Sequence, residues 1–426
     1  MEYRICLHLV EEERQLELAQ LVQKLLPPPC QEYVDAQDIN FQDGWQCRVR
    51  AYAPVPGNYR VEYMVGELQV NDHTYGLNEI IFRFDAEGAG GVRQLLQQFL
   101  QSNLPLVLDV TNLRLRAHQL LGRAQMSEMP LYDEEEVSTV FYCHLPWHML
   151  EVSKAWGDFL TKPNNRNLLR HLRVKLRRLR SSWSFCKCLL PKEFFDQWQG
   201  ILKSWTTLLG YTREYDVALS TCRKIRQNRL SGEEANLNTV SQLELVLEEL
   251  RQQQASKLPT LEQLNQITGQ LAELMLAVYL LPLQGGYKKE HLRAFFRERL
   301  SKWCAKLTSS LCYPEIKNME RLHKKRIRIK RLRYALQGMP ELEVPSSLMR
   351  IMKSLQDMLG LIHDDYVNAL LIEHILSQHQ EDETLKYQCA MFCGWERAKA
   401  EEALTTLPSL WENFRRQLAD WQKETL

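Results

Sequence analysis

The 426-residue sequence lacks a long hydrophobic run. Its best apolar stretch, LMLAVYLLPL at residues 274–283, has about half the length that a membrane-spanning helix needs. The opening residues, MEYRICLHLVEEERQ, lack the basic region followed by an apolar segment that is typical of a secretion signal. We therefore expect a cytoplasmic protein that does not cross a membrane.

The sequence also lacks the short motifs of several common enzyme classes. GxxxxGK[ST], HExxH and GxSxG are absent, which argues against the phosphate-binding loop, the zinc-protease helix and the serine-hydrolase elbow. The 11 cysteines do not form two pairs at zinc-finger spacing, and their odd number and irregular spacing favour reduced thiols over a disulfide framework. We predict no catalytic residue, no cofactor and no metal site.

Positive charge is in excess only in parts of the chain, not over the whole of it. The chain has 54 Lys and Arg against 53 Asp and Glu, so its formal net charge of +1 gives no global field that would attract polyanions. Yet the interval between Glu320 and Glu341 contains no acidic residue and includes RLHKKRIRIKRLRY, residues 321–334. This concentration of positive charge requires a local explanation.

The part of the chain up to about residue 130 has the pattern of an α+β domain. Alternating apolar and polar residues predict strands, with turn signals between them and one helix-period segment followed by a last strand. The predicted strands cover residues 45–55, 59–70, 78–85 and 106–116, the turns 54–58, 70–76 and 86–91, and the helix 92–105. An acidic linker at residues 132–138 ends this domain, which we place at residues 1–130.

The part from about residue 140 to residue 426 is predicted to be all α. Glycine and proline become rarer, and apolar residues recur at i, i+3, i+4 and i+7 in segments such as 239–254, 261–281 and 407–424. A break at LPLQGGYKKEH, near Gly285, divides this region close to its middle. We expect two halves, at about 140–284 and 285–426.

The two halves contain basic segments that align without a gap. RHLRVKLRRLR covers residues 170–180 and HKKRIRIKRLR covers residues 323–333. Positions 170, 173, 177 and 180 lie on one face of a helix about 15 Å long, and so do positions 323, 326, 330 and 333. Each segment is followed by a Leu-Gly pair, at Gly210 and Gly360, which we interpret as a polar turn. We expect the polar residues after each glycine to cap helices and to hold the basic side chains: Arg213, Glu214, Asp216, His363, Asp364 and Asp365.

Each basic helix also has an apolar stripe that can bury it against its neighbours. The stripes consist of Leu172, Leu176 and Leu179 in the first helix and Ile329, Leu332 and Leu336 in the second. Like charges at helical spacing repel, and nearby carboxylates that would offset them are missing. A single such helix is most simply a solvated basic face. Two copies in one repeat favour a pseudo-two-fold arrangement that brings the basic faces together around a bound polyanion.

The two basic segments resemble the signatures of the CHAD domain, the conserved histidine α-helical domain. The family pattern is H-x-x-R-[aliphatic]-x-x-[RK]-R-L-R, present twice and each time followed by a Leu-Gly segment. The resemblance covers about residues 140–426 and implies a bundle of two four-helix halves whose basic residues line a pocket or tunnel for inorganic polyphosphate, free or in granules. The ligands implied by the resemblance, including the Arg that replaces the family's first histidine, are Arg170, Arg173, Arg177, Arg178, Arg180, His323, Arg326, Lys330, Arg331 and Arg333.

The first signature departs from the family at one position. Arg170 stands where the family has a histidine, and His171 follows one residue later, about 100° round the helix. Arg170 keeps a permanent cation at this position, so we expect binding to survive and any pH sensitivity of this position to be lost. For His171 we expect a surface or packing role.

Two other functions are alternatives to polyphosphate binding. A nucleic-acid or acidic-partner module is one, but single-stranded nucleic acid is usually bound by cations interleaved with aromatics, and residues 166–180 contain none. Since CHAD domains are often fused to a CYTH domain, a metal-dependent triphosphatase is the other. MEYRIC resembles the CYTH opening E-x-E-x-K only in part, because Arg4 and Cys6 replace its second Glu and its Lys, so we expect at most a degenerate CYTH-like domain.

Overall fold

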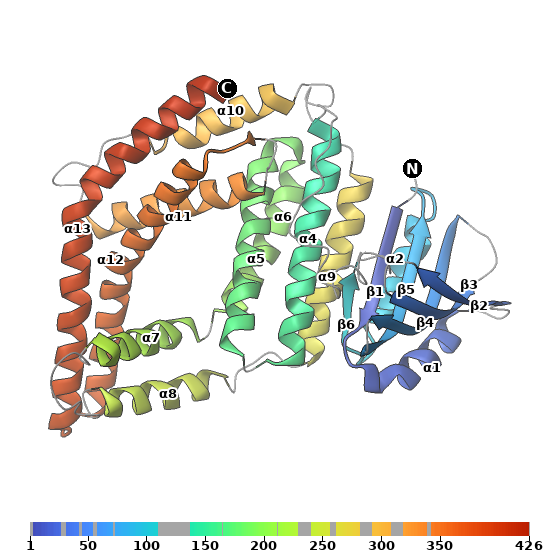
Figure 1. Cartoon of the computed structure of the whole chain (residues 1–426), viewed down its shortest axis with the longest axis horizontal. Helices are drawn as coiled ribbons and strands as arrows, with labels where there is room; N and C mark the ends of the chain where they lie inside the picture. The colour runs from blue at the N-terminus through green and yellow to red at the C-terminus, as the bar shows by residue number, and fades with distance from the viewer. Residues whose placement is uncertain are drawn as a thin grey trace. The chain divides into compact units, whose positions relative to one another are not determined.

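The computed structural model describes most of the chain, in thirteen stretches. These are residues 3–26, 31–41, 45–53, 58–70, 73–109, 137–163, 165–210, 212–228, 240–255, 261–281, 292–307, 318–338 and 342–425. The chain divides into two compact units, whose helices and strands are labelled in Figure 1. Unit 1 comprises Met1–Glu134, Ser138–Leu202 and Pro259–Lys288, and unit 2 comprises Glu135–Val137, Lys203–Leu258 and Lys289–Leu426.

Unit 1 contains a six-stranded antiparallel sheet in the order β2-β3-β4-β5-β1-β6. Its strands are β1 (Tyr3–Leu9), β2 (Gln31–Phe41), β3 (Trp45–Ala53), β4 (Tyr59–Val70), β5 (His73–Phe84) and β6 (Leu106–Asp109). One face of the sheet is apolar, because Ile5 lies opposite Phe82 and both are buried. Phe82 meets Phe99 of α2 edge to face, with ring centroids 6.0 Å apart. The helix α2 therefore packs on this apolar face.

Three predicted strands are confirmed by β3, β4 and β5, and the fourth is confirmed over Leu106–Asp109, while residues 54–57 and 110–116 lie outside the described residues. The helix predicted at 92–105 is confirmed up to Leu100, where α2 ends. Two predicted turns are wrong in part. Residues 73–76 belong to β5, because they continue its pairing with β4. Residues 89–91 already belong to α2 (Ala89–Leu100). Two glycines here allow close packing: a Cβ on Gly88 would lie 2.0 Å from the Asn58 carbonyl oxygen, and one on Gly91 would lie 2.3 Å from the Tyr59 ring, whereas nothing lies within 4 Å of a Cβ on Gly90.

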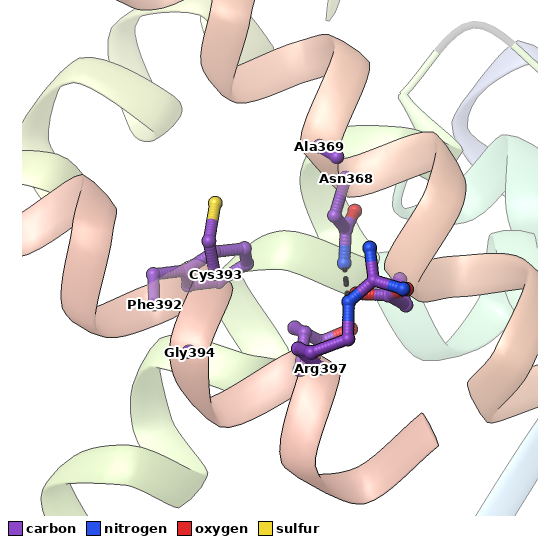
Figure 2. Close-up of a pocket in the computed structure, with 8 residues that line it drawn as sticks. Asn368, Ala369, Phe392, Cys393, Gly394 and Arg397 are labelled. Carbon is purple, nitrogen blue, oxygen red and sulfur yellow. Dashed lines mark hydrogen bonds and ion pairs between the residues drawn. The ribbon is translucent and has the colours of Figure 1, made fainter. Parts of the chain in front are cut away.

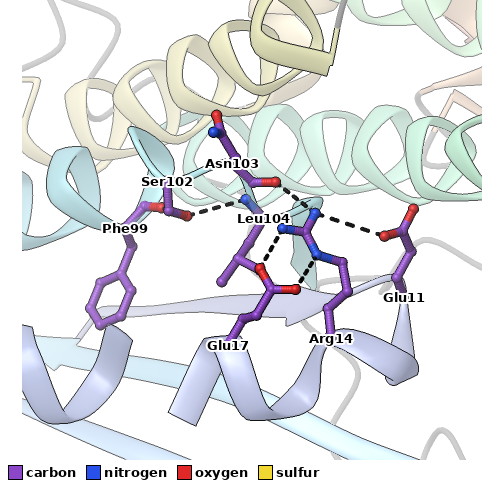
Figure 3. Close-up of polar contacts among 7 residues, drawn as sticks. All are labelled: Glu11, Arg14, Glu17, Phe99, Ser102, Asn103 and Leu104. Atoms are coloured by element: carbon purple, nitrogen blue, oxygen red, sulfur yellow. Dashed lines mark hydrogen bonds and ion pairs between the residues drawn. The ribbon is translucent and has the colours of Figure 1, made fainter. Parts of the chain in front are cut away.

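A guanidinium fastens the first helix of unit 1 to the segment before β6. Arg14, at the end of η1 (Glu12–Arg14), donates to both Glu17 oxygens at 3.0 and 2.6 Å and to the Asn103 carbonyl at 2.8 Å (Figure 3). Glu17 lies in the first turn of α1 (Gln15–Leu25). The bidentate pair with Glu17 joins η1 to α1, and the contact with Asn103 joins both to the segment between α2 and β6.

Every described element from Val137 onward is helical. Those of unit 1 are α4 (Val137–Thr161), α5 (Arg166–Phe185), η2 (Cys186–Leu189), the start of α6 (Lys192–Leu208) and α9 (Leu261–Leu280). Glu273 of α9 accepts from Arg93 and Gln97 of α2, at 3.0 and 3.1 Å. The helix α9, from the second half of the chain, thus packs against α2 of the N-terminal domain within the same unit. Within the described residues, no helix combines the length and apolar character needed to cross a membrane.

Unit 2 is a group of helices, four of which pack around an apolar cluster. Its complete helices are α7 (Arg213–Asn228), α8 (Ser241–Ala255), α10 (Leu292–Cys304), α11 (Met319–Gln337), α12 (Ser346–Gln378) and α13 (Glu383–Thr425). The cluster is formed by α7, α8, α12 and α13, with Cys222, Leu243, Ile375 and Phe392 among its buried side chains. Gln388 of α13 caps α8, because its side-chain oxygen accepts from the backbone N–H groups of Gln242 and Leu243 at 3.0 and 2.9 Å.

The apolar cluster predicts a stability test on α13. Phe392 is fully buried, so Phe392→Ala should lower the free energy of unfolding by about 3–5 kcal/mol. Tyr387→Ala on the same helix is the matched control, since 67% of Tyr387 is exposed. It should change the free energy of unfolding by less than about 0.5 kcal/mol. Denaturant unfolding followed by circular dichroism measures both, and equal effects would contradict the packing of α13.

Candidate functional site

The helix α11 combines a buried side with a cationic side. Asn318 caps its N-terminus, because the Asn318 side chain accepts from the Arg321 N–H at 3.0 Å. The predicted apolar stripe is confirmed, because Ile329, Leu332 and Leu336 are all buried. Lys325 is buried as well, and its ammonium lies 4.5 Å from the centre of the Trp411 ring of α13. These contacts fix the rotation of α11 and so the direction of its basic side.

Four predicted ligands lie on the side of α11 that carries the contacts to α12. The rings of His323 and His363 stack, with centroids 4.7 Å apart and an angle of 23° between their planes. The nearest guanidinium nitrogen of Arg326 lies 3.9 Å from Asp364 Oδ1. Further along, Arg333 donates to Gln356 at 3.1 Å. We call His323, Arg326, Lys330 and Arg333 the α11 basic face.

Arg326 is the most unusual member of the α11 basic face. Only 7% of it is exposed, and among the described residues its Nε has no hydrogen-bond partner. Burial is the main cause that lowers the pKa of Arg326 below its ordinary value, while Asp364 raises this pKa and Arg213 of α7 lowers it. An unsatisfied buried guanidinium donor costs free energy, and an anion that reaches it would remove this cost.

Gly360 of α12 lies directly against the Arg326 guanidinium. A Cβ at Gly360 would be 3.7 Å from a terminal nitrogen and 3.9 Å from Nε, which is ordinary van der Waals contact. A long side chain at this position would compete with the guanidinium for space. Our interpretation of Gly360 as a turn was wrong, because α12 runs from Ser346 to Gln378 without interruption. This glycine makes room for Arg326 and does not redirect the chain.

The other Leu-Gly segment does form the predicted turn. The helix α6 ends at Leu208, Gly210 lies in the connection, and α7 begins at Arg213. Glu214 and Asp216 lie in the first turn of α7, and Thr212 donates to Asp216 at 3.0 Å. Acidic groups at this end of a helix favour its dipole, and Asp216 also accepts from Arg251 of α8 at 2.7 Å; the capping role itself stays a prediction.

Arg331 lies outside the α11 basic face. It is exposed, and its guanidinium carbon lies 5.7 Å from the centre of the Trp303 ring of α10. The sequence position explains this: residue 331 is about 100° round the helix from residue 330. A cation stacked on a ring in this way contributes to packing. An anion bound at the α11 basic face would not contact Arg331, but an anion on the neighbouring side of α11 could.

The helix α5 repeats several of these features within unit 1. Asn165 caps it by accepting from Asn167 and Leu168 N–H groups at 2.9 and 3.3 Å. The predicted stripe Leu172, Leu176 and Leu179 is buried. Arg173 is 7% exposed, as is its counterpart Arg326. The other predicted ligands are more open: Arg177, Arg178 and Arg180 are half-buried, and Arg170 is exposed, as is His171.

A cavity of about 270 Å³ lies on another side of α12, between α12 and α13 (Figure 2). Asp365 on its wall pairs with Arg397 at 3.3 Å. Glu396 accepts from Thr221 at 2.8 Å and from Asn368 at 3.1 Å, and burial is the main cause that raises the pKa of both carboxyl groups. Asp365 therefore does not hold the basic side chains as predicted. Its partner is in α13, and the cavity is lined by residues of α12 and α13.

Sequence reasoning placed His363 and Asp364 near the basic residues but missed their geometry. Gln356, Gly360, His363 and Asp364 recur at i, i+4, i+7 and i+8, which puts them on one face of a continuous helix. This period was the signal that could have predicted how α12 faces α11. In the described part of the chain, no group of three or more His, Cys, Asp or Glu side chains could hold a metal ion.

Comparison with known proteins decides the family. The sequence profile of the CHAD domain matches residues 157–373, half of the chain. The chain belongs to the CHAD domain family. No curated protein matches the chain.

Two solved structures resemble the CHAD chain described here. The crystal structure of the CHAD domain from the plant Ricinus communis has 20% identity and a TM-score of 0.49, covering 69% of this chain and 95% of its own. PptA from Streptomyces chartreusis has 16% identity and a TM-score of 0.48, covering 65% of this chain and 99% of its own. The family assignment depends on the sequence match alone.

The contact between Gly360 and Arg326 yields a stability prediction. Gly360→Ala should raise the free energy of unfolding by about 0.5–1 kcal/mol, because alanine favours a helix and its Cβ would fit at 3.7 Å. Gly394→Ala in α13 is the matched control, since nothing lies within 4 Å of a Cβ there. Chemical denaturation measures both variants. A loss of stability in Gly360→Ala, with a gain in Gly394→Ala, would show that the guanidinium lies closer than described.

Proposed function

We propose that this CHAD protein binds inorganic polyphosphate, free or in granules, without catalysis. The observation that carries the proposal is the buried guanidinium of Arg326, whose Nε lacks a hydrogen-bond partner among the described residues and whose nearest carboxylate is 3.9 Å away. A chain of phosphates offers the oxygens that guanidinium donors bind most strongly. Membership of the CHAD family, which is associated with polyphosphate binding, supports the same ligand.

The proposed ligand set is the one that the family signatures imply. It comprises Arg170, Arg173, Arg177, Arg178 and Arg180 of α5, and His323, Arg326, Lys330, Arg331 and Arg333 of α11. We also propose that the helical region is a repeat of two four-helix halves, at about 140–284 and 285–426, after an N-terminal domain at 1–130. The identical burial of the aligned Arg173 and Arg326 supports the repeat.

The packing of Tyr334 supports polyphosphate over nucleic acid. Tyr334 is the one aromatic residue within the second basic segment, RLHKKRIRIKRLRY, but it is only 4% exposed and Arg333 lies 4.8 Å from its ring centre. A buried ring cannot stack on a nucleic-acid base. The described cysteines form no disulfide with one another, which is in keeping with a cytoplasmic location.

The alternative to binding without catalysis is a triphosphatase of the CYTH type, with its active site in the N-terminal domain. Arg4 and Cys6 lie in β1, at positions where that family needs a carboxylate and a lysine. Calorimetric titration with long-chain polyphosphate and with triphosphate, with and without magnesium, separates the two functions when released phosphate is assayed in the same samples. We expect tight binding of the long chain and no release; turnover of triphosphate would favour the enzyme.

The α11 basic face can be tested by removing its permanent cations. Each charge-assisted contact is worth about 1.5–3 kcal/mol, so changing Arg326, Lys330 and Arg333 together to Ala should weaken polyphosphate binding by at least about a hundredfold. The control with the same change in charge replaces the exposed Arg223, Arg297 and Lys353 of unit 2. If the control variant loses as much affinity as the folded triple variant, general charge and not this face binds the ligand.

Asp364 should oppose binding. Its carboxylate lies near both Arg326 and the His363 ring, at 3.9 and 3.5 Å, and would repel a phosphate that approaches them. Because Asp364 is partly exposed, Asp364→Asn should raise the affinity for polyphosphate only about two- to fivefold. Asp357→Asn, at an exposed position of the same helix, is the control. Weaker binding by Asp364→Asn would mean that this carboxylate positions Arg326 for the ligand.

A further inference from the structure

The stacked histidines are the titratable part of the α11 basic face. His323 comes from α11 and His363 from α12, and both are half-buried. Among the described residues, His323 Nδ1 is buried and has no hydrogen-bond partner. His363 Nδ1 lies 3.5 Å from Asp364 Oδ1. Within the described part of the chain, His363 therefore has a carboxylate beside it, and no ion pair joins His323 to one.

The charges around the pair are mostly positive. From α11, Arg326 and Lys330 act on His323; from α12, Asp364 is the one carboxylate in contact; and from α7, Arg213 acts on Arg326. The other neighbours of α11 contact its other sides, α10 through Trp303 and α13 through Trp411. Burial first, and then His363, Arg326 and Lys330, lower the pKa of His323. His323 is therefore mostly neutral at pH 7 in the free protein.

We propose that the His323–His363 pair takes up a proton when polyphosphate binds, so that affinity for the ligand increases as the pH falls. This inference rests on the proposed function, because it assigns a regulatory role to two residues at the same face. A phosphate oxygen close to the rings adds negative charge and a hydrogen-bond acceptor, and both favour the imidazolium form. Two imidazolium rings 4.7 Å apart would repel each other, so the pair shares about one proton.

The direction of the pH effect follows from linkage. The bound state holds more protons than the free state wherever the pH lies between the lowered pKa of His323 in the free protein and its raised pKa in the complex. Across this interval the affinity increases as the pH falls, and below the lower pKa it becomes constant. The permanent cations Arg326 and Arg333 supply the part of the affinity that does not change with pH.

Calorimetry in buffers of different ionisation enthalpy measures the protons directly. Wild-type protein is titrated with long-chain polyphosphate at pH 7 in phosphate-free buffers, and the slope of the binding enthalpy against the buffer ionisation enthalpy gives the number of protons taken up. The same titrations are made with the double variant His323→Gln/His363→Gln and with the control His374→Gln, an exposed histidine elsewhere in α12. Because the end groups of polyphosphate also titrate, the difference between wild type and double variant is the quantity of interest.

The inference predicts an uptake that is larger in wild type than in the double variant by up to about one proton, with His374→Gln unchanged. The affinity of wild type should rise by up to about tenfold from pH 8 to pH 6, and that of the double variant should rise less. Binding with equal proton uptake in wild type and double variant would overturn the inference and leave the proposed function intact. If neither the wild type nor any folded variant binds polyphosphate, the proposed function itself is overturned.

A second measurement keeps the inference testable if the double variant does not fold. The Cε1–H signals of the histidines in wild-type protein can be followed by NMR against pH, with and without polyphosphate, after assignment with the two single variants. The pKa of His323 should rise in the presence of polyphosphate. An unchanged titration of both rings in a sample that binds polyphosphate would contradict the coupling.

Discussion

The arrangement of unit 2 depends on one constraint: a helix that has several cations and almost no carboxylates must still be packed on one side. Like charges at helical spacing repel, so α11 is held in place by what it buries. Ile329, Leu332 and Leu336 form its apolar stripe, and Lys325 lies over the Trp411 ring. These contacts supply the free energy that keeps a repulsive surface in one fixed orientation.

The same constraint explains the neighbouring surface of α12. The described surface of α12 that faces these cations carries few partners for them. They are the amide of Gln356, the imidazole of His363 and the carboxylate of Asp364, beside the space left at Gly360. This is enough to orient Arg333, Arg326 and His323, but it leaves one buried donor of Arg326 without an acceptor in the described residues. A face that is oriented but incompletely neutralised is suited to binding an anion from outside the fold. The carboxyl groups of Asp365 and Glu396, in contrast, are engaged on another side of the helix.

The composition and the hydrophobic period of the sequence predicted the helices and strands better than the contacts between them. The spacing of residues 323, 326, 330 and 333 was sufficient to place them on one helix face, because the helical period is fixed by the backbone. The interruption expected at Gly360 was wrong, since a glycine can also serve a close approach, and here it serves the approach of Arg326. The stack of His323 on His363 joins residues far apart in the chain, and no local pattern could predict it. For the same reason, the association of α9 with the N-terminal sheet domain was not foreseen.

The most direct test of the account is whether phosphate reaches the buried donor of Arg326. The Nε–H signals of arginine side chains can be followed by NMR while long-chain polyphosphate is added, and Arg326→Lys identifies the signal that belongs to this residue. We expect the Arg326 signal to shift downfield as its N–H gains a charged acceptor, in step with saturation of the protein. An Arg326 signal that does not move while polyphosphate saturates the protein would show that the ligand binds elsewhere.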